Sequence, residues 1–259
     1  MHDLIDAKCF GTGPANALVQ SYFYEDDPAK PDNVFENYLA SMEGRAKTAI
    51  DAVVAEALAV PEGKRGLHGR GSISQAINDN YMADTIEFVA FQYFRVPGAA
   101  EQKRFEVSVS PGTAEEKEAA LRPGQVTFQG FRYAIERFRR MKRQLFVSQS
   151  QDFLTSDRPS FDLKDSDDSP LLGEDIGNDP GVVLYCPLHP RVGLILYPPE
   201  MSAAAPLVPD TWCRPVSDCV VRNQNTLVIQ QAERFVVASR EESFIPTVAK
   251  KRKKGYGSS

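Results

Sequence analysis

The sequence predicts an α+β fold in which a helical N-terminal half, about residues 32–143, packs on a small mixed β-sheet formed by about residues 144–240. Two observations support this prediction. Apolar residues recur every three or four positions in the first half, and short apolar runs rich in valine and leucine replace that period after residue 145. We expect one domain over residues 1–248 and a disordered basic tail over residues 249–259.

The composition is that of an ordinary globular protein. Of the 259 residues, 42% are hydrophobic and 25% are charged. There is no run of about 18 apolar residues, and the start MHDLIDAKCF lacks the basic and then apolar layout of a signal peptide. We therefore expect a cytoplasmic protein without a membrane partner. Its four cysteines are too few and too scattered for a disulfide framework.

The charge is unevenly distributed. The formal net charge is −5, but the five cations of KKRKK, residues 250–254, leave 25 basic against 35 acidic residues elsewhere. An acidic body of this kind argues against a general nucleic-acid-binding protein. The tail is an anion-binding segment, a nuclear address or, as most terminal basic runs are, a solvated chain end.

A long amphipathic helix is predicted from PDNVFENYLASMEGRAKTAIDAVVAEAL, whose start supplies capping side chains. Glu36 and Glu43 are seven residues apart, so both lie on one face beside the apolar stripe. Two such carboxylates either hold a divalent cation, share a proton, or are solvated charges that pair with Arg45 or Lys47. The apolar stripe comprises Phe35, Leu39, Met42, Ala46, Ile50, Val53 and Ala57.

A second helix is predicted over about residues 74–95, where the sequence VPG ends it. Gln92 and Arg95 fall in its last turn. A cation in that position complements the helix dipole, so Arg95 has a sufficient structural role there.

A third, basic helix is predicted within QVTFQGFRYAIERFRRMKRQLF. Its basic face either tracks phosphate groups or covers the core with its aliphatic stems while it balances the acidic body. The basic residues are six of the twelve over positions 132–143, namely Arg132, Arg137, Arg139, Arg140, Lys142 and Arg143.

Short strands are predicted in the C-terminal half. QLFVSQ and DFLTS form one hairpin, and PGVVLYCPL and RVGLILYPP form another that turns at His189 and Pro190. The acidic segment between the hairpins lacks calcium-loop spacing and indicates a mobile loop. A strand at DCVVRNQ, a helix near residues 225–234 and a strand at RFVVAS complete the prediction.

Cys186 and His189 form a C-x-x-H pair, and Cys213 and Cys219 follow it, which makes a weak zinc candidate. The cysteine spacing is not that of a zinc knuckle. Cys186 and Cys219 also lie in strand-like apolar runs, where a free cysteine is usually a small core residue.

Five phrases in order resemble one protein family, called domain of unknown function 4238. They are ENYLASMEGRAKTAI, FVAFQYFRVPG, FLTSDRPSF, VVLYCPLHPRVGLILY and VVRNQNTLVIQQAERFVVAS, spanning about residues 20–240 with the segments between them. The histidine-containing phrase Q-H-Y-V-P-x-x-Y-L with which the family begins has no counterpart in MHDLIDAKCFGTGP. The resemblance implies no reaction, but it singles out Glu36, Glu43, Gln92, Arg95, Ser156, Asp157, Pro159, Pro187 and Asn223 or Asn225.

If the helices pack on the sheet so that these residues converge, they suit a metal-dependent hydrolase of phosphodiesters, with nucleic acid as its substrate. Glu36, Glu43 and Asp157 would hold a divalent cation, and Asp157 would also position water. Arg95 would neutralise phosphate charge, beside Gln92, Ser156 and Asn223 as binding groups. Ser156 lies in no G-x-S-x-G elbow, which argues against a serine hydrolase.

Two alternatives remain at the level of sequence. In the first, Asp157 stabilises a turn before Pro159, and Arg95 joins it or Glu43 in a buried network without catalysis. In the second, the protein is a non-catalytic nucleic-acid- or protein-binding module whose contact residues include Arg139 and Arg140 on the basic helix 132–143.

Overall fold

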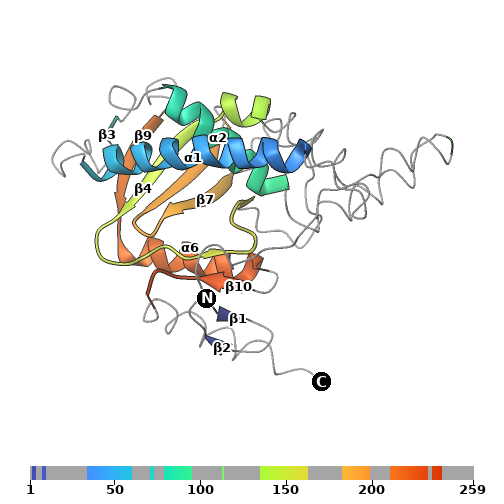
Figure 1. Cartoon of the computed structure of the whole chain (residues 1–259). Coiled ribbons are helices and arrows are strands. Elements are labelled where there is room, and N and C mark those ends of the chain that lie inside the picture. Colours follow the sequence, from blue (N-terminus) through green and yellow to red (C-terminus); the bar gives the residue numbers. More distant parts are fainter. Residues whose placement is uncertain are drawn as a thin grey trace.

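The computed structural model describes residues 2–3, 8–9, 34–59, 71–72, 79–94, 113, 135–162, 183–198, 211–232 and 235–240. Within these residues, two helices cover one face of a six-stranded sheet, and a third helix covers the other face with a four-stranded sheet beside it (Figure 1). The α+β class and the mixed sheet are therefore confirmed. Most of the predicted acidic loop and all of the basic tail lie outside the described residues.

Helices α1 (Val34–Ala59) and α2 (Asp79–Phe94) form the layer above the six-stranded sheet. They run antiparallel: Tyr38, near the start of α1, contacts Glu87, and Thr48, farther along α1, lies near Tyr81, which is earlier in α2. Residues spaced by three and four along α1, including Leu39, Met42 and Val53, are buried, as the apolar period predicts. Within the described residues, no helix combines the length and apolarity needed to cross a bilayer.

The six-stranded sheet is mixed, in the order β3-β9-β4-β8-β7-β6. Strand β4 runs antiparallel to β8 and parallel to β9, and β7 and β8 form the predicted hairpin. The strands are β3 (Gly71–Ser72), β4 (Lys142–Ser148), β6 (Phe161–Asp162), β7 (Leu184–His189), β8 (Val192–Tyr197) and β9 (Thr211–Val216).

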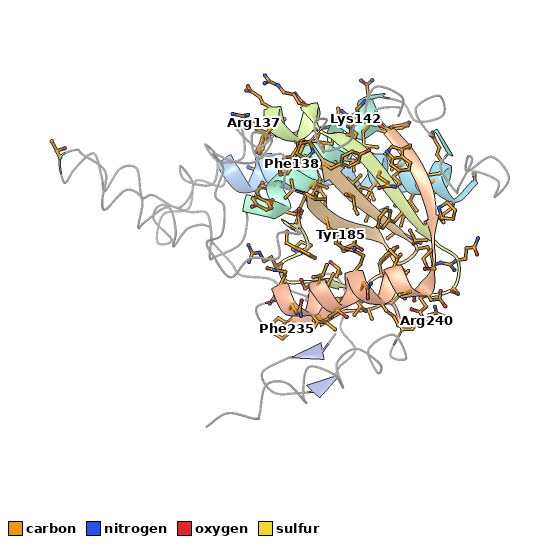
Figure 2. The ribbon with its side chains drawn as sticks, turned by 180° about the vertical axis from the view of Figure 1, so that it is seen from behind. Arg137, Phe138, Lys142, Tyr185, Phe235 and Arg240 are labelled. Atoms are coloured by element: carbon orange, nitrogen blue, oxygen red, sulfur yellow. The ribbon has the colours of Figure 1, made fainter. Side chains whose placement is uncertain are left out.

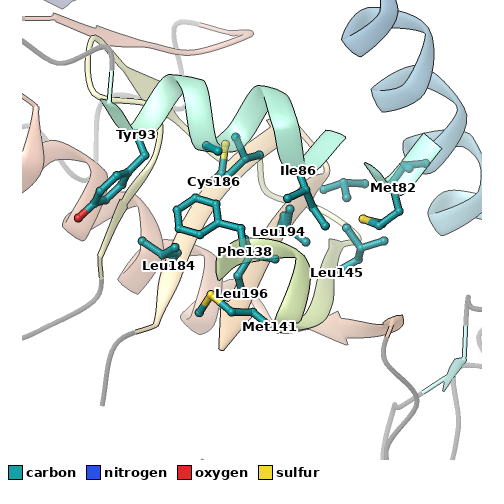
Figure 3. Close-up of a cluster of buried hydrophobic side chains, with 14 of the residues drawn as sticks. Met82, Ile86, Tyr93, Phe138, Met141, Leu145, Leu184, Cys186, Leu194 and Leu196 are labelled. Carbon is teal, nitrogen blue, oxygen red and sulfur yellow. The ribbon is translucent and has the colours of Figure 1, made fainter. Parts of the chain in front are cut away.

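Each face of this sheet has its own hydrophobic core. Leu145 and Val147 point toward α1 and α2, whereas Phe146 between them points to the opposite side. The core between the sheet and helices α1 and α2 is called the upper core here. Figure 3 shows this core, where strand residues such as Leu194 meet Ile86 of α2 and Phe138. Tyr185 belongs to the lower core, between the sheet and the third helix (Figure 2).

Helix α6 (Asp218–Gln231) covers the lower face of the six-stranded sheet. The small antiparallel sheet beside it has the order β2-β1-β10-β5. Its strands are β1 (His2–Asp3), β2 (Lys8–Cys9), β5 (Thr155–Ser156) and β10 (Phe235–Val237), the last of which confirms the strand predicted at RFVVAS.

The basic helix is shorter at its C-terminal end than predicted. Helical residues occupy 135–140, Met141 donates a backbone hydrogen bond to the Phe138 carbonyl at 3.2 Å, and β4 begins at Lys142. The reason is the adjacent apolar run of Leu145, Phe146 and Val147, which fills both cores as a strand but would leave part of a helix unburied. Lys142 and Arg143 therefore belong to the sheet.

Two further predictions in the C-terminal half are wrong. QLFVSQ and DFLTS do not form a hairpin, since β4 pairs with β8 and β9 while β5 pairs with β10 in the other sheet. DCVVRNQ is the start of α6, because Val221, Asn225 and Val228 are buried at helical spacing. Strand β9, TWCRPV, was not predicted, since its apolar run is short and contains a proline.

Close packing of Tyr185 on Gly193 gives a first prediction. A Cβ at position 193 would lie 2.9 Å from Cε2 and 3.0 Å from the hydroxyl oxygen of Tyr185, which is fully buried. Gly193→Ala should therefore lower the free energy of unfolding by about 1–3 kcal/mol, the usual cost of overpacking. Urea unfolding followed by circular dichroism measures this.

The matched control is Gly44→Ala on α1, where a Cβ has no atom within 4 Å. It should raise stability by about 0.5–1 kcal/mol, because alanine is the better helix former. If Gly193→Ala is as stable as the wild type, the packing of Tyr185 is not as described.

Candidate functional site

The segment around Ser156 and Asp157 forms a structural turn. Asp157 exchanges hydrogen bonds with Phe235, since its backbone N–H donates to the Phe235 carbonyl at 3.1 Å and its Oδ2 accepts the Phe235 N–H at 2.9 Å. The Ser156 hydroxyl donates to the Arg158 carbonyl at 3.0 Å and accepts the Arg158 N–H at 3.1 Å. Both side chains thus satisfy backbone groups, as in the turn alternative.

Asn225 on α6 joins this turn to the helix. Its Oδ1 accepts the Leu154 N–H at 2.8 Å, and its Nδ2 donates to the Asp152 carbonyl at 2.9 Å. The Asn225 side chain is buried, and it supplies the hydrogen bonds that Asp152 and Leu154 lack because neither residue lies in a strand. Of the two asparagines left open by the sequence, Asn223 is exposed on α6, so Asn225 is the one with a structural role.

A buried carboxylate fixes the chain after β10 to the same turn. Asp152 accepts hydrogen bonds from Arg240 Nε at 2.9 Å and from the Ser239 hydroxyl. Burial alone would raise the pKa of Asp152, but these two hydrogen bonds and the charges of Arg240 and Arg191 hold the pKa below its ordinary value. Neither Asp152 nor Arg240 was singled out from the sequence, because their pairing depends on the path of the chain through space.

Of the predicted catalytic residues, Glu43 and Asp157 are not brought together. Glu36 and Glu43 belong to α1 above the six-stranded sheet, and the side chain of Glu43 is exposed. Asp157 is bonded to Phe235, which Figure 2 places beside α6 on the lower side. Gln92 is buried on α2, and Arg95 lies outside the described residues. The six-stranded sheet therefore stands between Glu43 and Asp157, two of the three carboxylates that were predicted to share a cation.

Metal-binding groups are likewise dispersed. Among the residues that the structure describes, no three histidine, cysteine, aspartate or glutamate side chains are placed to hold a metal ion. Cys186 and Cys213 are buried in the upper core, and burial raises the pKa of Cys186 to about 12. Cys219 is exposed on α6, and His189 accepts the Arg191 N–H at Nδ1 in the hairpin turn. The zinc candidate is therefore not assembled.

Arg139 and Arg140 lie on an exposed surface at the end of the short helical segment 135–140. We call Arg137, Arg139, Arg140, Lys142 and Arg143 the basic surface. Figure 2 shows Arg137 and Lys142 at the end of the molecule remote from α6. This group includes the two residues that the sequence predicted as binding residues, and it is separate from the turn at Asp157.

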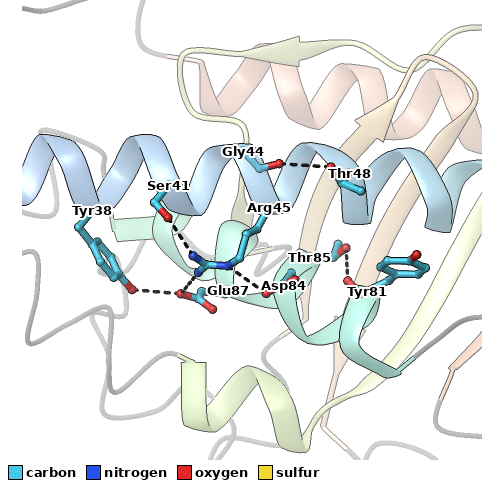
Figure 4. A network of polar contacts seen from close by, with 9 residues as sticks. All are labelled: Tyr38, Ser41, Gly44, Arg45, Thr48, Tyr81, Asp84, Thr85 and Glu87. Atoms are coloured by element: carbon cyan, nitrogen blue, oxygen red, sulfur yellow. Dashed lines mark hydrogen bonds and ion pairs between the residues drawn. The ribbon is translucent and has the colours of Figure 1, made fainter.

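A polar cluster joins α1 to α2 (Figure 4). Arg45 on α1 lies 3.6 Å from Asp84 and 3.4 Å from Glu87 on α2, and Tyr38 donates to Glu87 at 3.0 Å. Burial, and then the hydrogen bond to Glu87, raise the pKa of Tyr38. Arg45 thus pairs with carboxylates of α2, while Lys47 pairs with Asp51 on its own helix at 2.6 Å.

The sequence contained a partial signal for this cluster. Asp84 and Glu87 are three residues apart on α2 and share one face, but nothing local identifies Arg45 as the partner. That pairing needs the antiparallel packing of the two helices.

The chain belongs to the family described as protein of unknown function DUF4238. The family model matches residues 2–142 and 121–242, which extends farther toward the N-terminus than the phrases from about residue 20 indicated. No protein in the curated set and no solved structure matches the chain. The family assignment thus confirms the resemblance and supplies no activity.

Asn225→Ala should be strongly destabilising. It leaves the Leu154 N–H and the Asp152 carbonyl without their partner in a buried place, at about 1–3 kcal/mol for each group. The expected loss of unfolding free energy is therefore about 2–6 kcal/mol. Asn223→Ala, on the exposed side of the same helix, should change stability by less than about 0.5 kcal/mol. Equal effects of the two substitutions in urea unfolding would refute the role of Asn225.

Asp152 should make stability depend on acid pH. Because its pKa is lower in the folded protein, the carboxylate stabilises the fold above the ordinary aspartate pKa of about 3.9, and this stabilisation is lost as pH falls through the folded-state pKa. Asp152→Asn should therefore cost on the order of 1–2 kcal/mol at pH 7, a value reduced because the Arg240 side chain is exposed to solvent.

The difference between Asp152→Asn and the wild type should shrink as the pH falls below about 4 in urea unfolding. A difference that stays constant over this range would show that the charge of Asp152 does not contribute.

Proposed function

We propose that the protein is a non-catalytic nucleic-acid-binding module that contacts the phosphodiester backbone through the basic surface. The observation that carries this proposal is the density of positive charge: five of the seven residues from Arg137 to Arg143 are basic. Arg139 and Arg140 are exposed, and the other three are partly exposed. Clustered arginine and lysine side chains bind phosphates and release counterions, which gives affinity without base contacts.

The backbone of the basic surface is anchored by buried side chains and by the hydrogen bonds of Arg143. Phe138 and Met141 are buried in the upper core between the cations. Arg143 donates to the Arg139 carbonyl at 2.8 Å and to the Thr211 hydroxyl at 3.4 Å, so it joins the helical segment to strands β4 and β9. A surface ordered in advance loses less conformational entropy when a partner binds.

The chemistry of this surface favours nucleic acid over protein. Protein interfaces draw most of their energy from aromatic and apolar side chains that become buried. In the described part of the chain, the exposed large hydrophobic residues are Tyr38 and Leu58, both on α1. The basic surface has none of them, and its regular positive charge suits a chain of phosphates.

The hydrolase hypothesis is less well supported. Its three carboxylates were to share one cation, but Glu43 and Asp157 lie on opposite sides of the six-stranded sheet. Asp157 is also engaged with the backbone of Phe235. Binding without cleavage is therefore the function that we propose, and the acidic body leads us to expect micromolar affinity at low salt.

Fluorescence anisotropy with a labelled single-stranded RNA and a DNA of the same sequence tests the proposal. Residues 250–254 would be glutamine in every protein, so that the five cations of the tail do not dominate binding. The salt dependence of affinity should be steep, and Arg139→Gln with Arg140→Gln should reduce the slope of log K against log salt by about 1.4, or about 0.7 for each lost contact. Affinity should fall about tenfold or more at low salt.

The matched control is Lys47→Gln with Arg222→Gln, which removes two exposed cations from α1 and α6. It should leave affinity and slope nearly unchanged. Binding that is absent, independent of salt, or equally weakened by both double variants would overturn the proposal.

A further inference from the structure

A hollow between α1 and α2 is distinct from the basic surface. Its volume is about 460 Å³, and it is open to solvent along α1, where Ser41, Gly44, Arg45 and Thr48 are exposed. The lining side chains include one cation, one anion and three hydroxyl groups: it is lined by Ser41, Gly44, Arg45, Thr48, Ala49, Tyr81 and Asp84.

Gly44 lines this hollow without a side chain. A Cβ at that position would have no atom within 4 Å, so the missing side chain leaves open space in the middle of α1. Glycine in a helix interior costs stability, and nothing about the backbone of α1 requires it there. The hydroxyl of Thr48 turns back to the Gly44 carbonyl at 3.4 Å, which keeps that side chain along the helix.

The charges in the hollow are incompletely paired. Arg45 makes contacts of 3.3 Å with Ser41, 3.4 Å with Glu87 and 3.6 Å with Asp84. Charge-assisted hydrogen bonds between such groups are normally about 2.7–2.9 Å, so these contacts are loose. Among the residues that the structure describes, no side chain donates a hydrogen bond to the Asp84 carboxylate. Glu87, by contrast, also accepts the Tyr38 hydroxyl.

We propose that this hollow binds a free α-amino acid or a similar small zwitterion. Its carboxylate would accept hydrogen bonds from Arg45, and its ammonium group would donate to Asp84. The two charges of an amino acid are a few ångströms apart, as are Arg45 and Asp84 at 3.6 Å. The ligand would thus replace one loose ion pair with two closer ones, and Tyr81 and Ala49 would contact its uncharged side chain.

Other ligand classes fit this hollow less well. A lone anion would approach Arg45 beside two carboxylates, Asp84 and Glu87, and would be repelled by them. A lone cation would satisfy Asp84 but leave the loose contacts of Arg45 unchanged. A zwitterion adds no net charge and addresses both groups.

Thermal shift with each of the twenty common amino acids at about 10 mM, followed by titration calorimetry of those that stabilise, tests this inference with the full chain. At least one should raise Tm, since a ligand that binds only the folded state stabilises it. For each one that does, the analogue without the amino group and the analogue without the carboxylate should bind at least tenfold more weakly. If no amino acid raises Tm, or if either analogue binds as well, the inference is wrong.

Two variants at one position separate binding from folding. Gly44→Leu fills the hollow and should abolish binding, whereas Gly44→Ala leaves most of the space and should retain it. Gly44→Ala should fold, because a Cβ at position 44 has no atom within 4 Å, and circular dichroism checks that Gly44→Leu is folded as well. Asp84→Asn should lower the affinity for the amino acid but should not change the affinity for nucleic acid at the basic surface. Amino acid binding that survives Gly44→Leu would place the ligand elsewhere.

Discussion

Burial of the central strands on both faces is the constraint on which the rest of the structure depends. In β8, Val192, Leu194 and Leu196 face α1 and α2, while Ile195 faces α6. A polar group on either face must find a partner inside the protein or remain unsatisfied. Among the described strand residues, Arg143, Gln144 and Tyr185 are exceptions, since each has a buried polar atom without a hydrogen bond. The candidate binding groups described above lie on the helices and at the end of the sheet.

The same constraint gives the family phrase FLTSDRPSF a structural meaning. Leu154 and Phe153 fill the lower core, while Asn225 and Asp157 satisfy the backbone of the neighbouring segments. Asp152 then fixes the chain after β10 through Arg240. These bonds connect three segments that are distant in sequence, so they stabilise the lower layer as a unit. A residue pattern typical of a family need not indicate an active site when its side chains bond to backbone.

The sequence was sufficient for elements whose pattern is long or repeated. The 26-residue helix α1 and the β7–β8 hairpin were predicted because apolar spacing alone distinguishes them. It was insufficient where a short apolar run suits either a helix or a strand, as at Val220–Val221, which was predicted as a strand and lies in α6. Whether such a run forms a helix or a strand is decided by the core that its residues fill.

The candidate sites likewise differ in how far the sequence could predict them. Arg139 and Arg140 were predicted as binding residues from local charge density, and they are exposed as that requires. The cleft of Glu43 and Asp157 was predicted from a resemblance and an assumed packing, and the sheet separates them. The cluster of Arg45 with Asp84 and Glu87 was missed, because cross-helix partners depend on how α1 and α2 pack.

The central claim is that the six-stranded sheet separates the carboxylates of α1 from the turn at Asp157. A pulsed electron-spin distance between labels at Glu43→Cys and native Cys219 tests it most directly, in a chain with Cys9→Ser. Cys219 is exposed on α6, and α6 contacts strand β5, which ends next to Asp157. Cys186 and Cys213 are buried and should not react with the label. Two layer spacings of about 10 Å each predict at least about 20 Å between the labels. A distance under about 15 Å would contradict this arrangement of layers.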